Sequence, residues 1–311
     1  MADFPRRFEL RHDSPCDIPE PEAIWPSGEA GQPGEGELVT ERGEESYNRF
    51  VANIKVPVLR SFLPDMARSC GIGVVICPGG AYRGVAFDKE GCEVARFFNS
   101  MGAAAFVLNY RVPAPDGRPG MLPEAPLEDA ARAIRIVRAR ASQLGLEKDR
   151  IGIMGFSAGG HVAASASTLY RTVRDPDPAM DAVSPRPDFT ALLYSVISMS
   201  APYSHGDSAR ALLGEAPSEQ AAIRFSPEKQ VDSGTPPAFL AMTEDDPVNP
   251  LNSIEYYKAC LASGVKAEMH VFPEGGHGYG MALRGLGVDS WPDRLAEWLR
   301  RLFNVQDIPK A

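Results

Sequence analysis

The chain has 311 residues, an apolar fraction of 44% and a charged fraction of 23%. These ordinary globular values exclude wholesale disorder, a collagen-like fibre and a coiled coil, and the length suits one large α/β domain or two ordinary domains. The net charge of −9 gives no electrostatic footprint for nucleic acid, and the sequence has no apolar run of 18 residues that would predict a membrane span.

The five cysteines are odd in number and form no CxxC or Cys/His cluster, so neither a disulfide framework nor a zinc site is expected. No cofactor is expected either. The sequence lacks the apolar run of a signal peptide, which favours a cytoplasmic location. A secreted chain from which the signal peptide has been cleaved would look the same.

Residues 1–48 are rich in Pro, Gly and Glu and predict an irregular N-terminal arm, pinned by Trp25, ahead of a single catalytic domain at 49–311. Strand-like and helix-like segments then alternate. We expect strands at 53–64, 72–77, 104–110, 151–154, 192–199, 238–242 and 267–272, and helices at 88–99, 126–144, 161–170, 250–262 and 289–302. This alternation predicts a mostly parallel sheet with helices on both faces.

Two segments interrupt the alternation: residues 171–190, which are rich in Pro and Asp, and residues 203–236, which are polar with helical stretches. We expect both to be lid-like insertions or pocket walls rather than separate domains. One helical stretch also carries a cluster of basic residues that predicts a solvated helix face, namely Arg132, Arg135, Arg138 and Arg140.

The segment Gly155–Gly159 reads Gly-Phe-Ser-Ala-Gly and matches the G-x-S-x-G nucleophile elbow, with Ser157 as the nucleophile. Small residues are needed there because bulky side chains two positions before or after the serine would collide with the neighbouring strand and helix. A predicted strand precedes the motif and a predicted helix follows it, which is the context that this elbow requires. The alternative, a glycine-rich turn of a nucleotide-binding fold, would need a G-x-G-x-x-G pattern that the sequence lacks.

A serine nucleophile needs a base, normally histidine, and the chain has only five. His12 lies in the arm, His161 follows Ser157 by one helical turn and faces packing, and His270 lies within a predicted strand. His277, in a glycine-rich loop after the last strand, is therefore the expected base, and His205 is the weaker alternative because it has the wrong chain order for this family of sites.

The acid must lie between the serine and the histidine in the chain. The predicted strand at 238–242 ends in three carboxylates, Glu244, Asp245 and Asp246. Asp246, followed by Pro and Val, fits the usual loop best, and Asp245 remains the alternative. The acid would hold the tautomer of the imidazole and stabilise the imidazolium.

Acyl transfer also needs hydrogen-bond donors for the oxyanion. The run Pro78-Gly79-Gly80-Ala81-Tyr82 follows the first buried strand and predicts an oxyanion loop, with donors at the backbone N–H groups of Gly80, Ala81 and Ala158. An ordinary Pro-Gly turn is the alternative interpretation. Tyr82 and Tyr279 are expected to stack on a substrate sugar ring.

Taken together, these segments resemble the α/β-hydrolase superfamily, in particular the branch of acetylxylan esterases and bifunctional feruloyl/acetyl esterases close to the hormone-sensitive-lipase-like enzymes. The resemblance covers roughly residues 50–303. It is carried by the segments 78–82, 88–91, 109–112, 155–161, 186–189, 245–248 and 275–278, with Gly-Phe-Ser-Ala-Gly-Gly-His and Gly-Gly-His-Gly the most specific.

The resemblance implies an eight-stranded hydrolase sheet and cofactor-free ester hydrolysis through an acyl-enzyme on Ser157, acting on small acyl groups, especially acetyl, on xylan-type sugars. The missing export signal favours acetylated oligosaccharides or a small ester over a polymer, and a homodimer is compatible with the sequence. Two other functions stay open: an exopeptidase or amidase with the same three residues, and a non-catalytic hydrolase fold that binds a small molecule.

Overall fold

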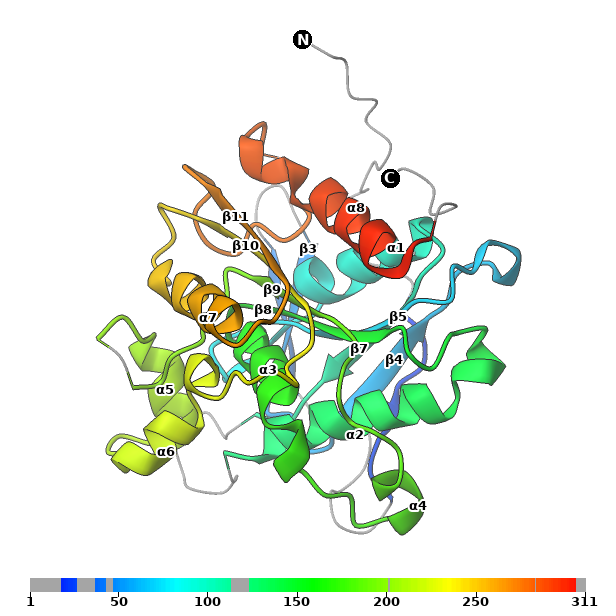
Figure 1. Cartoon of the computed structure of the whole chain (residues 1–311), viewed down its shortest axis with the longest axis horizontal. Coiled ribbons are helices and arrows are strands. Elements are labelled where there is room, and N and C mark those ends of the chain that lie inside the picture. Colours follow the sequence, from blue (N-terminus) through cyan, green and yellow to red (C-terminus); the bar gives the residue numbers. More distant parts are fainter. Residues whose placement is uncertain are drawn as a thin grey trace.

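The central strands are buried on both faces and contain almost only apolar residues, as expected for a parallel sheet covered by helices. The computed structural model describes residues 18–26, 37–42, 47–112, 123–200, 202–282 and 284–305. Within these ranges, one sheet has eight strands (Figure 1), in the order β1 (Glu22–Ala23), β4 (Val58–Phe62), β7 (Ala104–Asn109), β5 (Gly73–Cys77), β8 (Ile151–Phe156), β9 (Thr190–Leu193), β10 (Ala238–Thr243) and β11 (Ala267–Phe272). The pairs from β7 to β11 are parallel, whereas β1 and β4 are antiparallel to their neighbours.

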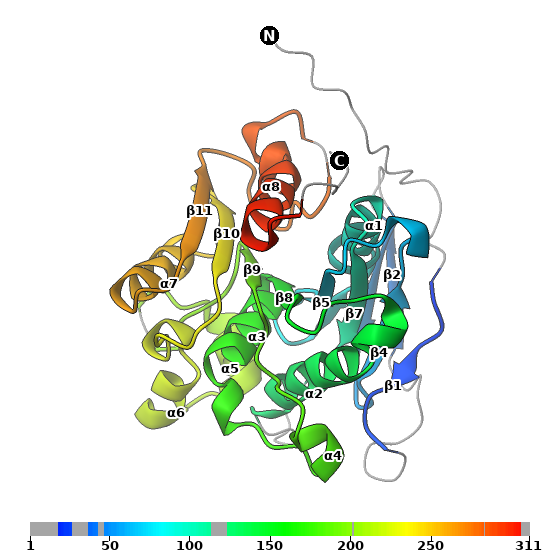
Figure 2. The same cartoon turned by 45° about the vertical axis from the view of Figure 1, so that its right-hand side comes forward.

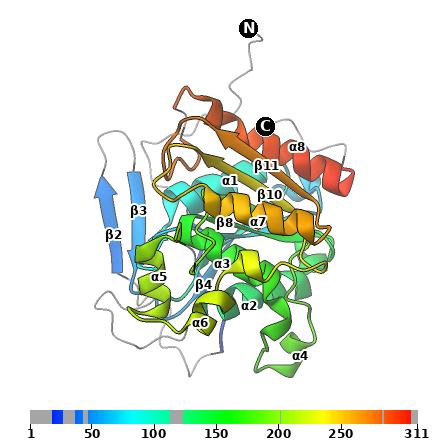
Figure 3. The same ribbon diagram turned by 60° about the vertical axis from the view of Figure 1, so that its left-hand side comes forward.

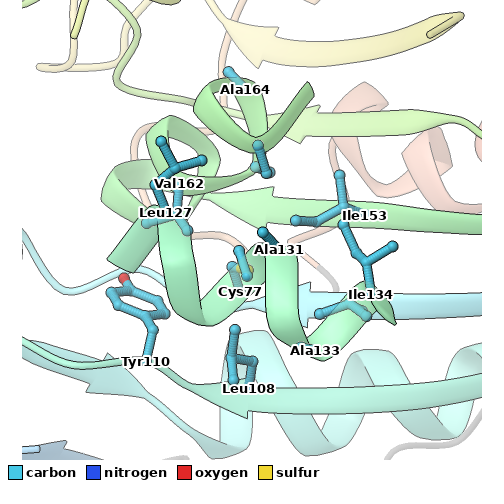
Figure 4. Close-up of a cluster of buried hydrophobic side chains, with 14 of the residues drawn as sticks. Cys77, Leu108, Tyr110, Leu127, Ala131, Ala133, Ile134, Ile153, Val162 and Ala164 are labelled. Atoms are coloured by element: carbon cyan, nitrogen blue, oxygen red, sulfur yellow. The ribbon is translucent and has the colours of Figure 1, made fainter. Parts of the chain in front are cut away.

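Helices cover both faces of this sheet. On one face lie α2 (Ala125–Ala139), α3 (Ser157–Thr168) and α7 (Leu251–Ala262); on the other lie α1 (Glu93–Ser100) and α8 (Trp291–Phe303) (Figure 1). Figure 4 shows how Leu127 and Ile134 of α2 and Val162 of α3 gather over Cys77 and Ile153 of the strands. The two apolar layers confirm the expected α/β-hydrolase architecture.

Short helical segments complete the list. They are α4 (Pro178–Asp181), α5 (Gly206–Leu213), α6 (Glu219–Arg224), the π-helical turn η2 (Asp88–Cys92) and the 3-10 turns η1 (Met66–Arg68), η3 (Ala141–Leu144), η4 (Tyr170–Thr172), η5 (Pro227–Lys229) and η6 (Gly287–Ser290). In the described part of the chain no helix is both long and apolar enough to cross a membrane.

Two described stretches of the N-terminal region form strands, which its composition does not predict. β1 and β2 (Glu37–Arg42) both lie within residues 1–48, so the expected irregular arm is wrong for these residues. β2 pairs with β3 (Tyr47–Ala52), and β3 pairs with β6 (Gly84–Ala86), in a second, antiparallel sheet. Figure 3 shows β2 and β3 at one side of the molecule, apart from the main sheet. The expected boundary between residues 48 and 49 falls inside β3. The strand expected over 53–64 is present as β4, which is shorter and covers Val58–Phe62.

Trp25 does tie the N-terminal region to the domain. Its indole Nε1 donates a hydrogen bond of 2.7 Å to Oδ1 of Asp129 on α2, and the guanidinium of Arg132 lies 4.6 Å from its ring centroid. A buried carboxylate and a cation on the ring face hold this side chain in place.

The basic cluster on α2 is not a solvated face. Arg132, Arg135 and Arg138 are buried, and the expectation of solvent exposure is wrong for all three. Each of the three is paired with an aspartate of residues 171–190: Arg132 with Asp175, Arg135 with Asp181 and Arg138 with Asp188. The spacing of three residues places these arginines on one stripe of the helix. The segment 171–190 lies along that stripe, with α4 beside α2 (Figure 2).

This packing also corrects the role expected for residues 171–190. Asp188 accepts a hydrogen bond of 2.9 Å from the N–H of Ile151, the first residue of β8, so the segment reaches the amino ends of the strands. The nucleophile elbow lies at the opposite, carboxyl ends. Residues 171–190 therefore cannot be a lid over the elbow, whereas residues 203–236, which contain α5 and α6, follow β9 on the same side as the elbow.

The Asp175→Asn variant tests the buried arginine stripe. Because it leaves the Arg132 guanidinium buried without an opposite charge, we expect the free energy of unfolding to fall by about 3 kcal/mol. The matched control is Arg140→Ala, which breaks an exposed pair with Glu22 and should cost less than about 1 kcal/mol. Urea unfolding measures both, and equal losses would mean that burial does not set the strength of these pairs.

Candidate active site

The carboxyl ends of four parallel strands carry the segments singled out above. The oxyanion loop, defined as Pro78–Arg83, follows β5; Ser157 follows β8; Asp246 follows β10; and the histidine loop, defined as Pro273–Gly280, follows β11. Ligands of open α/β sheets bind outside these carboxyl ends, so the topology alone gathers these residues at one edge.

Ser157 is the first residue of α3 and has a φ of 50°, a left-handed conformation that is strained for a residue with a side chain. The turn closes only because its neighbours lack side chains. A Cβ atom at Gly155 would overlap the backbone of Gly159, and one at Gly159 would overlap the carbonyl oxygen of Cys77. This close approach is the steric requirement that the sequence motif predicted.

The structure brings Ser157, His277 and Asp246 together. Nε2 of His277 lies 2.9 Å from Oγ of Ser157, and its Nδ1 lies 2.8 and 3.0 Å from the two carboxylate oxygens of Asp246. A carboxylate can only accept, so Nδ1 carries the proton and Nε2 is free to accept the proton of the serine hydroxyl. The Asp246 side chain is 1% exposed, and its Oδ1 is fixed further by the N–H of Val248 at 2.7 Å.

Asp245, the alternative acid, has a different task. Its carboxylate accepts the N–H groups of Gly276 at 2.8 Å and Gly275 at 3.2 Å, and the bond from Gly276 is the main cause that lowers its pKa. The Asp245 carboxylate therefore holds the backbone of the histidine loop, whereas the Asp246 carboxylate bonds to the imidazole of His277.

The remaining histidines are placed elsewhere. His270 bonds to Glu268 within β11, and His205 caps α5 by accepting the N–H of Ser208. His161 is buried and bonds to Tyr82 and Phe225, as the packing interpretation predicted. His12 lies outside the described residues.

The oxyanion loop adopts an unusual backbone, with φ of 152° at Gly80, 52° at Ala81 and 59° at Tyr82. Gly79 donates its N–H to the carboxylate of Glu90 at 2.6 Å, whereas the N–H groups of Gly80 and Ala81 have no protein acceptor among the described residues. The N–H of Ala158 lies in the first turn of α3, where helical N–H groups have no acceptor within the helix. Free donors at these three positions are what a developing oxyanion requires.

Tyr82 and Tyr279, the two residues expected to stack on a sugar, are both 1% exposed. The Tyr82 hydroxyl bonds to Nδ1 of His161 at 2.6 Å, and the Tyr279 hydroxyl donates to the carbonyl of Ala241 at 3.3 Å. Since both rings are packed in the interior, the expectation of ring stacking on substrate is wrong for this structure. Sequence alone could not separate a tyrosine beside the site from one beneath it.

His161 joins the oxyanion loop to the α6 segment. Its Nε2 bonds to the carbonyl oxygen of Phe225 at 2.7 Å, so Nε2 must carry the proton and Nδ1 accepts from the Tyr82 hydroxyl. Burial lowers the pKa of His161 to about 4, which keeps the imidazole neutral. The neutral His161 side chain on α3 thereby connects Tyr82 of the oxyanion loop to Phe225 at the end of α6.

Acid stability tests this role of His161. The pKa in the folded chain, about 4, lies below the unfolded value of 6.5, so the unfolded chain binds the proton first as the pH falls. The contribution of neutral His161 to the free energy of unfolding is fully present above pH 6.5. It is lost as the pH falls toward 4, by roughly 3 kcal/mol in total. Urea unfolding at several pH values should show this loss in the parent chain and not in His161→Gln; parallel curves for the two proteins would contradict it.

Two residues of the site were missed by sequence reasoning. Glu90 lies in the segment Asp88–Gly91, whose resemblance to the family was noted without a role, and Tyr194 follows β9 with no sequence signal. Both touch the loops that carry the site. For metals, no group of three His, Cys, Asp or Glu residues in the described ranges is arranged to hold an ion.

A doubly covered, mostly parallel sheet of this strand order, with a strained serine after β8 and a histidine after the last strand, defines an α/β hydrolase. The chain belongs to the BD-FAE family, whose model matches residues 62–260.

Named relatives agree with this membership. The chain is 37% identical over 242 residues to endo-1,4-beta-xylanase B of Butyrivibrio fibrisolvens, covering 77% of this chain and 37% of that protein. It is 32% identical over 246 residues to the acetylxylan esterase of Xylanibacter ruminicola, covering 78% and 47%. The chain therefore spans less than half the length of these two relatives.

Among solved structures, the acetyl ester-xyloside bifunctional hydrolase from Caldicellulosiruptor lactoaceticus is similar over nearly the whole length of both chains. The TM-score is 0.77 at 34% identity, covering 93% of this chain and 98% of the other. The carboxylesterase Cest-2923 from Lactobacillus plantarum, at 23% identity and a TM-score of 0.66, supports the fold alone.

Proposed function

We propose that the chain is a serine carboxylic-ester hydrolase that removes acetyl groups from xylan-type sugars, with Ser157, His277 and Asp246 as its catalytic residues. The observation that carries the proposal is the unbroken path from Oγ of Ser157 through the imidazole of His277 to the buried carboxylate of Asp246. The names of two similar proteins, an acetylxylan esterase and an acetyl ester-xyloside bifunctional hydrolase, support the acetyl-sugar substrate.

The geometry suits acyl transfer in two steps. In the first, Oγ of Ser157 attacks the ester carbonyl carbon while Nε2 of His277 takes the hydroxyl proton. The oxyanion of the tetrahedral intermediate accepts the N–H groups of Gly80, Ala81 and Ala158. His277 then donates the proton to the leaving alcohol oxygen, which departs and leaves an acyl group on Ser157.

In the second step, water replaces the alcohol. His277 takes a proton from the water as its oxygen attacks the acyl carbon, the same N–H groups stabilise the second oxyanion, and the proton returns to Oγ of Ser157 as the carboxylic acid leaves. Asp246 stays ionised throughout and stabilises the imidazolium that forms in each step.

A substrate panel tests the class of reaction. The purified chain should hydrolyse p-nitrophenyl acetate faster than the butyrate, leave the octanoate and an amino-acid p-nitroanilide nearly untouched, and release acetate from acetylated xylo-oligosaccharides. Turnover of the anilide alone would replace the esterase by an amidase. Binding of acetylated sugars without any turnover would replace it by a non-catalytic binding protein.

A further inference from the structure

Glu90 is a buried carboxylate that no step of the mechanism uses. It lies in the π-helical turn η2 after the oxyanion loop and is 4% exposed. Both of its oxygens have a donor: Oε2 accepts the N–H of Gly79 at 2.6 Å, and Oε1 accepts the hydroxyl of Tyr194 at 2.8 Å. Removing a carboxylate from water costs free energy unless hydrogen-bond donors compensate. The buried Glu90 side chain therefore depends on the Gly79 N–H and the Tyr194 hydroxyl.

Tyr194 carries the connection onward to the histidine loop. Its hydroxyl accepts the N–H of Gly280 at 3.1 Å, and its ring meets the imidazole of His277 edge-on, with centroids 4.9 Å apart and planes at 66°. The residue has a φ of 37° and is 1% exposed, so its backbone is held in a strained conformation by the packing around it.

These contacts form one path: Gly79 in the oxyanion loop, Glu90, Tyr194, and Gly280 in the histidine loop. We propose that Glu90 is a positioning residue that, through Gly79 and Tyr194, holds the oxyanion donors and His277 at the spacing that acyl transfer needs. The inference rests on the proposed function, because it assigns Glu90 to the same site. A misplacement of about 1 Å at a reacting group can cost about 10²-fold in rate, so such a brace has a measurable effect.

Two conservative variants interrupt the path at different points. In Glu90→Gln, one oxygen remains to accept a hydrogen bond, while the amide nitrogen cannot accept from the second donor. Tyr194→Phe keeps the ring against His277 but deprives both Glu90 and Gly280 of their partner. We expect kcat for p-nitrophenyl acetate to fall by roughly 10- to 100-fold in each variant, with KM changed by less than about threefold.

The double variant tests whether the two residues act as one path. If they do, Glu90→Gln with Tyr194→Phe should lower kcat by little more than the worse single variant, because the second change removes a connection that is already broken. A fall equal to the product of the single effects would mean that they act independently and would overturn the proposal.

A buried residue away from the site separates positioning from folding. Asp175→Asn, which breaks the buried pair with Arg132 of α2, should lower the urea midpoint while kcat per folded molecule stays at the parent value. Parent-level kcat in folded Glu90→Gln and Tyr194→Phe would show that Glu90 is structural only and would overturn the inference. If Glu90→Gln does not fold, Tyr194→Phe alone decides by the same criterion.

The parent chain distinguishes this inference from the proposed function. If the parent hydrolyses the ester and Ser157→Ala does not, a failure of the Glu90 and Tyr194 variants to lower kcat rejects the positioning role alone. If the parent hydrolyses none of the esters, the proposed function is wrong and the role of Glu90 in it is rejected as well.

Discussion

Ser157→Ala is expected to lower kcat/KM for p-nitrophenyl acetate by at least about 10⁴-fold, with the fold unchanged. Alanine lacks the Oγ atom that attacks the ester carbonyl. The oxyanion donors and binding contacts that remain account for a small residual rate at most. Steady-state hydrolysis measures the loss, and circular dichroism checks the fold. Since alanine fits the left-handed position no worse than serine, the urea midpoint should change little.

The His277→Ala variant, alone and combined with Ser157→Ala, tests whether the two residues act together. Because the serine and the histidine act as a unit, the double variant should be no slower than the worse single variant. Equal turnover by Ser157→Ala and the parent chain would mean that another residue is the nucleophile, and the assignment of all three catalytic residues would then fail.

Asp246→Asn should lower kcat by about 10⁴-fold, whereas Asp245→Asn should lower it by less than about tenfold. The amide that replaces Asp246 can offer its N–H to Nδ1 of His277 and so favours the tautomer whose Nε2 carries the proton, which cannot accept from Ser157. Asp245 accepts N–H groups of the histidine loop, and its loss loosens that loop without altering the tautomer of His277.

The two neighbouring variants are matched in chemistry and differ only in which carboxylate is neutralised. Parallel kcat measurements across neutral pH decide between them. A larger loss in Asp245→Asn would contradict the geometry and would restore the alternative acid that the sequence left open.

The sequence predicts much of the site because the motifs lie at strand ends. A parallel sheet sends Ser157, Asp246 and His277 to one edge whatever the details of packing, and the need for small residues around the elbow can be read directly from Gly155 and Gly159. The choice of Asp246 over Asp245 needed coordinates, because two adjacent carboxylates in one loop differ only in direction.

The errors have a common physical origin, which is long-range packing. Arg132 and its neighbours have the periodicity of an exposed basic stripe, and they are buried by segments distant in the chain, chiefly residues 171–190, whose aspartates pair with them. Tyr82 and Tyr279 belong to site loops, yet their hydroxyl groups point inward to His161 and Ala241. Glu90 was missed for the same reason, because its partner Tyr194 lies 104 residues further along the chain.

The identity of the nucleophile is tested most directly by covalent labelling with diethyl p-nitrophenyl phosphate. This ester phosphorylates an activated serine and releases p-nitrophenol, and the adduct hydrolyses slowly enough to be mapped by peptide mass spectrometry. We predict one diethyl phosphate per chain on Ser157, a loss of esterase activity in proportion to labelling, and no label in Ser157→Ala. Label on another residue, or full activity in the fully labelled protein, would contradict the assignment.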